Sequence, residues 1–330
     1  MYGELLRLLA DDYELGGQSL PVLRGHENDP GPSALALRLL GGVHRLVLSG
    51  EVPELAAFYP SVGGEWDPVL GWDAFQQVLE SRRDEIRVWL EQPPQTNEVG
   101  RAAALMAGLL RIGESFRLPV RLFEIGASAG LNLRADRFAY GDAAGGWSGD
   151  PSSPVRLAGA WQGEPLTPWP DLAVVSREGA DIAPVDPVTD DGALTLTSYV
   201  WPDQAERLAR LRGALRIARE VPAVVHRQDA VSFVRGLSPD AGTTTVLWHS
   251  VMWQYLTADD QAAVDEAIVA LGKQAGDHAP FAHLFLEPTR RTPDSTHEFL
   301  VVLTLWPGGE RRVLGKAAPH GIPSEWERDA

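Results

Sequence analysis

The chain has no cysteine among its 330 residues. This absence excludes disulfide bonds, thiolate metal sites and cysteine nucleophiles together. It also means that the redox state of the compartment cannot be inferred from cysteine usage.

Lysine is scarce, because only Lys273 and Lys316 occur among the 29 basic residues. The 45 acidic residues give the chain a formal net charge of −16 at pH 7. A polyanion repels phosphate backbones, and the arginines are scattered rather than gathered in a basic patch. We therefore expect no nucleic-acid partner.

Long apolar runs are absent as well, since no segment approaches the ~20 apolar residues that cross a bilayer. The first residues, Met1–Arg7, lack the basic start of a signal peptide, and Asp11-Asp12 interrupts the apolar run early. We therefore expect a cytoplasmic protein with no membrane partner. A hydrophobic content of 44% and a charged content of 22% predict a globular fold.

Residues 1–117 are predicted to form a helical N-terminal cap region. Apolar residues recur there at helical spacing, and the three longest runs cover 34–48, 72–90 and 98–116. Pro93-Pro94 ends the second run, because proline lacks a backbone donor and disfavours helix in the residue before it.

Residues 118–330 predict a Rossmann-type domain, because short β-rich runs alternate with helical runs. The runs expected as parallel strands cover 120–125, 172–176, 223–226, 243–248 and 281–286. The runs expected as helices cover 131–138, 203–220 and 258–272. Such alternation indicates βαβ units and a parallel sheet with both faces covered.

The end of the chain breaks this alternation. The runs 298–306 and 311–316 flank Pro307-Gly308-Gly309 and predict an antiparallel hairpin. The fold class expected is therefore α/β, with a doubly wound, mostly parallel, seven-stranded sheet that ends in this hairpin. Residues 139–171 are rich in glycine, proline, serine and tryptophan, and are expected as an insertion loop.

The strongest local motif follows the first expected strand and reads Glu124-Ile125-Gly126-Ala127-Ser128-Ala129-Gly130. Small residues at the end of a parallel strand let a ligand approach the backbone, and the helix behind them offers free N–H groups. The spacing differs from the dinucleotide motif G-x-G-x-x-G, and the lysine of a P-loop is missing. It does match the G-x-S-x-G string of serine hydrolases, with Ser128 as nucleophile.

Context separates these interpretations. Hydrolase sheets normally have strands ahead of the nucleophilic serine, whereas residues 1–117 supply mostly helices. In addition, Glu124 has no role in the strand–turn–helix motif that presents a hydrolase serine. A hydrolase would pair Ser128 with Asp229 and His249, or with Glu287 and His297. The motif favours a site that binds S-adenosylmethionine, and a hydrolase, another nucleotide-binding fold and a purely structural turn stay as alternatives.

The run Phe123–Asn132 resembles a stretch of a bacterial family catalogued as a domain of unknown function, DUF2332. The similarity extends from about residue 30 to the end, through Gln95–Arg101, Gly149–Pro151, Tyr199–Gln204, Arg227–Ala230, His249-Ser250 and Ala318–Gly321. This family is similar to class I S-adenosylmethionine-dependent methyltransferases. The resemblance therefore implies a methyltransferase-like fold and S-adenosylmethionine as cofactor.

The resemblance also implies which residues hold the cofactor. Residues at the ends of the first three strands are expected to contact the methionine, ribose and adenine parts of the cofactor. These residues are Glu124, Gly126, Ser128, Gly130, Asp181, Asp229 and Ala230. Glu178 and Asp186 are alternatives to Asp181 at the ribose. A tight glycine turn and a helix N-cap at Asp229 are the structural alternatives.

A second set is expected to form the acceptor pocket. His249 is the candidate general base, because an imidazole pKa near 6.5 suits proton removal at neutral pH. The candidate substrate-binding residues follow the fourth strand or precede the helix at 98–116, and these residues are Ser250, Tyr255, Asn97, Glu98 and Arg101. We expect the last three to face the same cleft as Glu124 and His249.

The function expected is transfer of a methyl group from S-adenosylmethionine to a small-molecule acceptor. The alternatives are a catalytically inactive binding or regulatory protein of the same fold, and a serine hydrolase that uses Ser128. No metal is expected, because the eight histidines are dispersed and show no ligand spacing.

Overall fold

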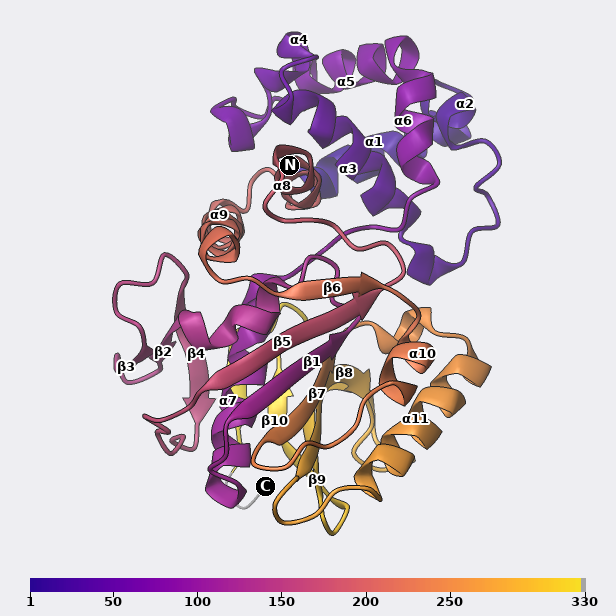
Figure 1. Cartoon of the computed structure of the whole chain (residues 1–330). Coiled ribbons are helices and arrows are strands. Elements are labelled where there is room, and N and C mark those ends of the chain that lie inside the picture. The colour runs from indigo at the N-terminus through magenta and orange to yellow at the C-terminus, as the bar shows by residue number, and fades with distance from the viewer. Residues whose placement is uncertain (328–330) are drawn as a thin grey trace. The chain divides into compact units, whose positions relative to one another are not determined.

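Helices fill the first part of the chain, and a sheet fills most of the rest (Figure 1). The computed structural model describes residues 1–327, which divide into two units. The helical unit comprises Met1–Thr96 and Val185–Ala209. The sheet unit comprises Asn97–Pro184 and the chain from Arg210 onward.

The helical unit is held together by the apolar faces of its helices. Its elements are α1 (Tyr2–Glu14), α2 (Ser19–Leu23), η1 (Gly31–Ser33), α3 (Leu35–Leu48), α4 (Pro53–Ala56), η2 (Pro60–Val62), α5 (Leu70–Ser81), α6 (Arg83–Leu90) and α8 (Asp190–Ser198). In α3, Leu39, Val43 and Leu46 are at most 2% exposed, at the spacing that the sequence predicts. They share one core with Phe75 of α5.

The run 72–90 was expected to form a single helix, and this prediction is wrong. It forms α5 and α6, and the backbone between them leaves helical geometry at Arg82, which has φ −117° and ψ 21°. Arg82 donates hydrogen bonds to Glu51 and Glu85. The break lets Leu79 and Ile86 both reach the core, where neither side chain is exposed.

The sheet unit contains one 11-stranded sheet within the described residues, with the order β3-β2-β4-β11-β10-β9-β8-β7-β1-β5-β6. The central parallel strands are β1 (Val120–Ile125), β5 (Val174–Asp181), β6 (Val224–Arg227), β7 (Thr244–Ser250) and β8 (Phe281–Thr289). The expected hairpin is present as β9 (Glu298–Trp306) and β10 (Glu310–Ala317), which pair antiparallel. A mixed α/β fold with a mostly parallel sheet is therefore confirmed.

The expected number of seven strands is wrong. The segment 139–171, expected as a loop, contains β2 (Ala139–Asp142), β3 (Trp147–Gly149) and β4 (Arg156–Gly163). Near the end of the chain, β11 (Ser324–Trp326) pairs with both β4 and β10 and so joins this extension to the central sheet.

Helices cover both faces of the central strands. The remaining elements of the sheet unit are η3 (Val99–Arg101), α7 (Ala102–Ser115), η4 (Leu131–Arg137), α10 (Ala230–Arg235), η5 (Trp253–Tyr255) and α11 (Ala258–Gly272), and α9 (Ala205–Glu220) leads into this unit. Thr257 caps α11 by accepting the N–H of Asp260 at 3.2 Å.

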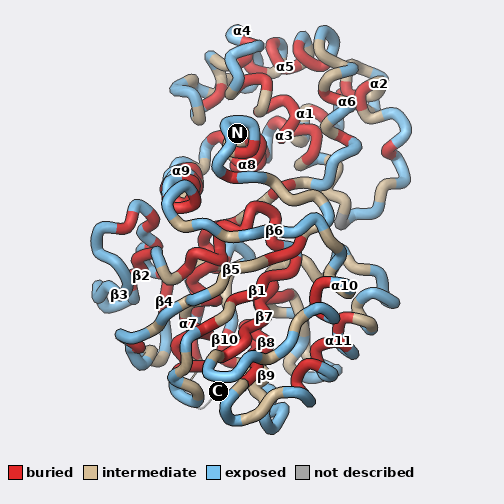
Figure 2. Tube along the Cα trace, in the orientation of Figure 1, coloured by how far each residue is buried: buried red, intermediate tan, exposed pale blue. Residues whose placement is uncertain are grey.

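The two faces can be told apart on β8. Leu284 faces α7, since a Cβ on Gly108 of α7 would lie 2.2 Å from the Leu284 Cδ2 atom. Phe281 packs instead in a cluster with Val264 and Ile268 of α11. Successive side chains of a strand point to opposite faces, so α7 covers one face and α11 the other. Figure 2 shows β1 and β7 buried between them.

Candidate functional site

The strand order identifies one crevice position in the sheet. The parallel strands lie in the order β6-β5-β1-β7-β8. After β1, the chain adds β5 and then β6 on one side of it, and β7 and then β8 on the other side. In open α/β sheets, ligands bind at the carboxyl ends of the strands where the order reverses. Here that position lies between Gly126, after β1, and Ser250, at the end of β7.

The glycine motif forms a tight turn at this position. Gly126 has φ 65°, Ser128 has φ 51° and Gly130 has φ 63°. The N–H of Ser128 donates to Asp181 Oδ2 at 2.8 Å, and the N–H of Ala183 donates to Asp181 Oδ1 at 2.9 Å. Asp181 therefore fixes the turn, and of the three acids considered for the ribose it is the one bound to the glycine turn.

Unfavourable backbone conformations occur on both sides of the crevice. Val251, directly after β7, has φ 51°, and Ser128, after β1, has the same value. A positive φ is uncommon for any residue other than glycine and is most costly for a β-branched residue such as Val251, and residues with such backbone strain cluster at ligand sites and switch regions. The two strand ends that flank the crevice thus carry two such residues.

Glu124 is the most perturbed carboxyl group near the turn. The residue is 2% exposed, and its Oε2 atom has no hydrogen-bond partner among the described residues. Burial raises the pKa of the Glu124 carboxyl to about 8, and the side chain of Trp248, a hydrogen-bond donor, lowers this pKa. The negative charge of Asp181 raises it, and the positive charges of Arg101 and Arg134 lower it by smaller amounts. Glu124 is therefore mostly protonated at neutral pH.

The segment 97–101 braces the glycine turn and the start of η4. Asn97 Oδ1 accepts the N–H of Leu131 at 2.8 Å, and the carbonyl of Glu98 accepts a hydrogen bond from Asn132 at 3.2 Å. Arg101 Nη1 donates to the carbonyl of Ser250 at 3.3 Å. Asn97 and Glu98 therefore contact the start of η4, directly after the glycine turn, and Arg101 reaches the end of β7.

Met252 lies directly over Gly126. A Cβ atom built on Gly126 would stand 2.7 Å from the Met252 Cβ atom, closer than real contacts allow. Gly126 is therefore required both for its positive φ and for the close approach of Met252.

Three further predicted residues follow β6 or β7 along the chain. Asp229 is exposed, and its Oδ1 atom accepts the N–H of Ser232 at 2.8 Å as the N-cap of α10. That contact lowers the pKa of the Asp229 carboxyl. Ala230 is half-buried beside it, and Tyr255 is 53% exposed.

His249 lies on the other face of the sheet from Glu124. In the parallel pairing of β1 with β7, Glu124 stands opposite Trp248, so the next residue, His249, points to the α11 side. Its Nδ1 atom lies 2.8 Å from Glu287 Oε1, and its Nε2 atom lies 3.0 Å from His283 Nε2. The expectation that His249 shares a cleft with Glu124 is corrected by this arrangement.

The same contacts bear on the hydrolase interpretation. Both ring nitrogens of His249 face Glu287 and His283 rather than Ser128. The sequence pairing of His249 with Asp229 is not formed either, because Asp229 caps α10. His283 was missed from the sequence, although His283, Phe285 and Glu287 alternate on one strand and so share a face.

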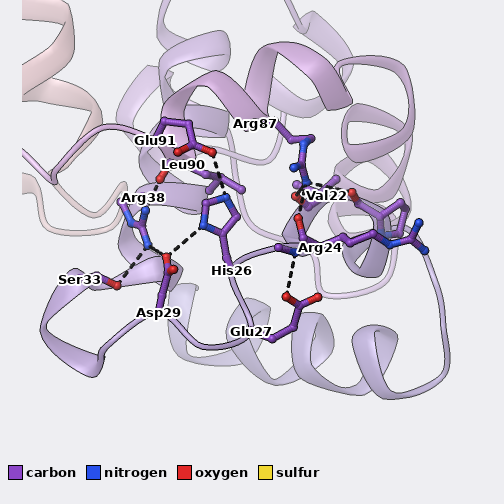
Figure 3. Close-up of polar contacts among 12 residues, drawn as sticks. Val22, Arg24, His26, Glu27, Asp29, Ser33, Arg38, Arg87, Leu90 and Glu91 are labelled. Atoms are coloured by element: carbon purple, nitrogen blue, oxygen red, sulfur yellow. Dashed lines mark hydrogen bonds and ion pairs between the residues drawn. The ribbon is translucent and has the colours of Figure 1, made fainter.

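A separate polar cluster lies in the helical unit. Figure 3 shows His26 directed toward Asp29 and Glu91, with Arg38 bound to Asp29. His26 Nδ1 lies 3.0 Å from Asp29 Oδ2, and hydrogen bonds from Arg38 and His26 lower the pKa of Asp29. These contacts hold the segment before α3 against the end of α6, so the cluster is structural. Within residues 1–327, no group of three or more His, Cys, Asp or Glu side chains is arranged to hold a metal ion.

These features define a mixed α/β protein whose sheet is mostly parallel. The family model described as "Uncharacterized protein conserved in bacteria (DUF2332)" matches residues 1–326, and the chain belongs to this family. A search of curated proteins found no match. In the part of the chain that the structure describes, no helix has the length and apolar character needed to span a membrane.

Proposed function

We propose that the protein transfers a methyl group from S-adenosylmethionine to a small-molecule acceptor. One observation carries the proposal: a buried carboxyl group, Glu124, has an oxygen without a partner beside a left-handed glycine turn at the strand-order reversal. A buried polar atom without a partner is costly, so a ligand that supplies a hydrogen-bond donor there is favoured.

The amino group of a methionine moiety fits this requirement. An ammonium group beside Glu124 would favour the carboxylate over the carboxylic acid and would supply the missing donor. Gly126 is exposed at the turn and has no side chain of its own to block a ligand, whereas Gly130 is buried. Asp181 already accepts two backbone N–H groups, and carboxylate oxygens have lone pairs left for a hydroxyl group.

When bound, S-adenosylmethionine supplies an electrophilic methyl group. The chain's own residues orient the cofactor and enclose it. Glu124 would hold the amino end, Asp181 a ribose hydroxyl group, and Asp229 with Ala230 the adenine. Orientation accounts for much of the acceleration in such displacements. His249 has no role in this proposal, because it lies on the other face of the sheet.

The acceptor is proposed to be a small molecule. A net charge of −16 disfavours polyanionic substrates. Asn97, Glu98 and Arg101 are proposed as acceptor-binding residues, because their contacts reach the carbonyl of Ser250 and the start of η4.

Calorimetric titration with S-adenosylhomocysteine tests this proposal. The wild-type protein should bind it, and Glu124→Gln should bind at least tenfold more weakly, the order expected from losing a charge-assisted hydrogen bond. Glu310→Gln, an exposed carboxylate on β10, is the matched control and should bind as the wild type does. A wild-type protein that binds NAD or ATP but no S-adenosylhomocysteine at millimolar concentration would overturn the proposal.

A further inference from the structure

A cavity of about 450 Å³ opens on the α11 face of the sheet, on the side opposite Glu124. Its walls come from β7, β8, β9, β10, η5 and α11, and include His249, His283, Glu287, Trp253 and Asp265. The glycine turn and Glu124 do not line it. The cavity is therefore a second location, separate from the proposed methyltransferase site.

The two oxygens of Glu287 differ sharply in what they bind. Oε1 lies 2.8 Å from His249 Nδ1 and accepts the backbone N–H groups of Met252 at 3.0 Å and Trp253 at 3.3 Å. Oε2 has no hydrogen-bond partner within residues 1–327. The Glu287 side chain is only 5% exposed. One oxygen is saturated, and the other lacks the donor that a buried carboxylate requires.

Flat rings surround this carboxylate. The ring of His249 stacks on Trp253 at 5.1 Å between centroids and on Phe285 at 5.2 Å. Trp306 also lines the cavity. Aromatic faces attract organic cations through the negative charge of the π-system.

The charges in the cavity favour the same kind of ligand. Asp265 contributes a second carboxyl group, whose pKa is raised by burial and lowered by His249. Burial, His249 and Arg311 lower the pKa of His283, so this imidazole stays neutral at pH 7. Arg311 is the one arginine or lysine among the lining residues, and it is exposed. A metal ion is not indicated, since the described residues contain no metal-binding group.

We propose that this cavity binds a small organic cation, a protonated amine or amidine attached to a flat or apolar body. The nitrogen donates to Glu287 Oε2, and the body lies against Trp253 and Phe285. This inference goes beyond the proposed methyl transfer and does not depend on it, because its residues lie on the other face of the sheet.

Benzamidine and benzoate are suitable probes, because they have similar shapes and opposite charges. Saturation-transfer NMR followed by titration should show that benzamidine binds and that benzoate does not. Glu287→Gln should weaken benzamidine binding at least tenfold. Glu266→Gln, an exposed residue of α11 outside the lining, is the matched control and should leave binding unchanged.

Circular dichroism establishes whether Glu287→Gln folds. If it does not fold, Asp265→Asn and Trp253→Ala replace it, and both should weaken benzamidine binding several-fold. Equal binding of benzoate, absence of benzamidine binding, or binding that is unchanged in these cavity variants would overturn the proposal.

Discussion

Glu287 Oε1 accepts the backbone N–H of Met252 at 3.0 Å, and Met252 in turn packs against Gly126. A residue of β8 that faces the α11 side thus fixes the loop that covers the glycine turn at the end of β1. The conformation of this loop includes the positive φ of Val251. The loop is therefore held by hydrogen bonds at a position where its backbone is unfavourable.

Replacement of Gly126 by alanine tests the close packing at the turn. The positive φ alone costs about 1–2 kcal/mol for a residue with a Cβ. The new Cβ would also meet Met252, so we expect a larger loss of unfolding free energy and loss of S-adenosylhomocysteine binding. Denaturant unfolding and calorimetry measure the two effects.

Gly242→Ala is the control for this experiment. Gly242 also has a positive φ, of 81°, but a Cβ there would meet nothing within 4 Å. Gly242→Ala should show the conformational cost alone and retain binding. Equal losses of unfolding free energy and of binding in the two variants would mean that packing against Met252 contributes to neither.

Two variants of Asp229 separate its capping role from the proposed contact with adenine. Asp229→Ala should lower the unfolding free energy by about 0.5–2 kcal/mol, because it removes the N-cap of α10. Asp229→Ser keeps a capping oxygen but removes the carboxylate. Asp229→Ser should therefore be nearly as stable as the wild type yet bind S-adenosylhomocysteine more weakly. Unchanged binding in a stable Asp229→Ser protein would limit Asp229 to the cap.

Stability should depend on pH through Glu124. Burial raises its pKa from 4.5 to about 8, so the folded state keeps a proton that the unfolded state loses. The free energy of unfolding therefore falls as pH rises from about 4.5 to 8 and is independent of this group above that range. Glu124→Gln removes this contribution.

Thermal unfolding between pH 5 and pH 8 measures this effect. Relative to the wild type, Glu124→Gln should gain stability at pH 8 and lose this part of the pH dependence. The gain in Tm should be ~2–4 °C for each kcal/mol of stability. A wild-type protein and a variant with parallel pH profiles would show that Glu124 keeps an ordinary pKa.

Local patterns in the sequence predicted several elements well. The spacing of apolar residues gave α11 and β9 with the bounds that the structure has. The break at Arg82 was not predictable, because no proline or glycine marks it and it depends on packing of two helix faces in the core. β2, β3 and β4 were missed because each contains glycine, a residue that weakens strands and is typical of loops.

The candidate site was predictable only in part. Glu124 and Asp181 were candidates because an acidic residue beside a glycine turn, or at the end of the next strand, is a local signal, and the structure places Asp181 on the glycine turn. The face on which His249 lies depends on the register of β7 against β1, and one residue of register moves a side chain to the other face. A single sequence does not contain that register, so His249 was assigned to the wrong side.

The role of Glu124 in cofactor binding is tested by counting the protons released when S-adenosylhomocysteine binds at pH 7. Calorimetry in two buffers with different ionisation enthalpies measures this number. Because the pKa of Glu124 is about 8, the free protein carries this proton at pH 7, and an ammonium group beside Glu124 should expel it. We expect release of about one proton by the wild type and markedly less by Glu124→Gln. Binding with no proton release, or with equal release by both proteins, would contradict the assignment of Glu124 to the cofactor.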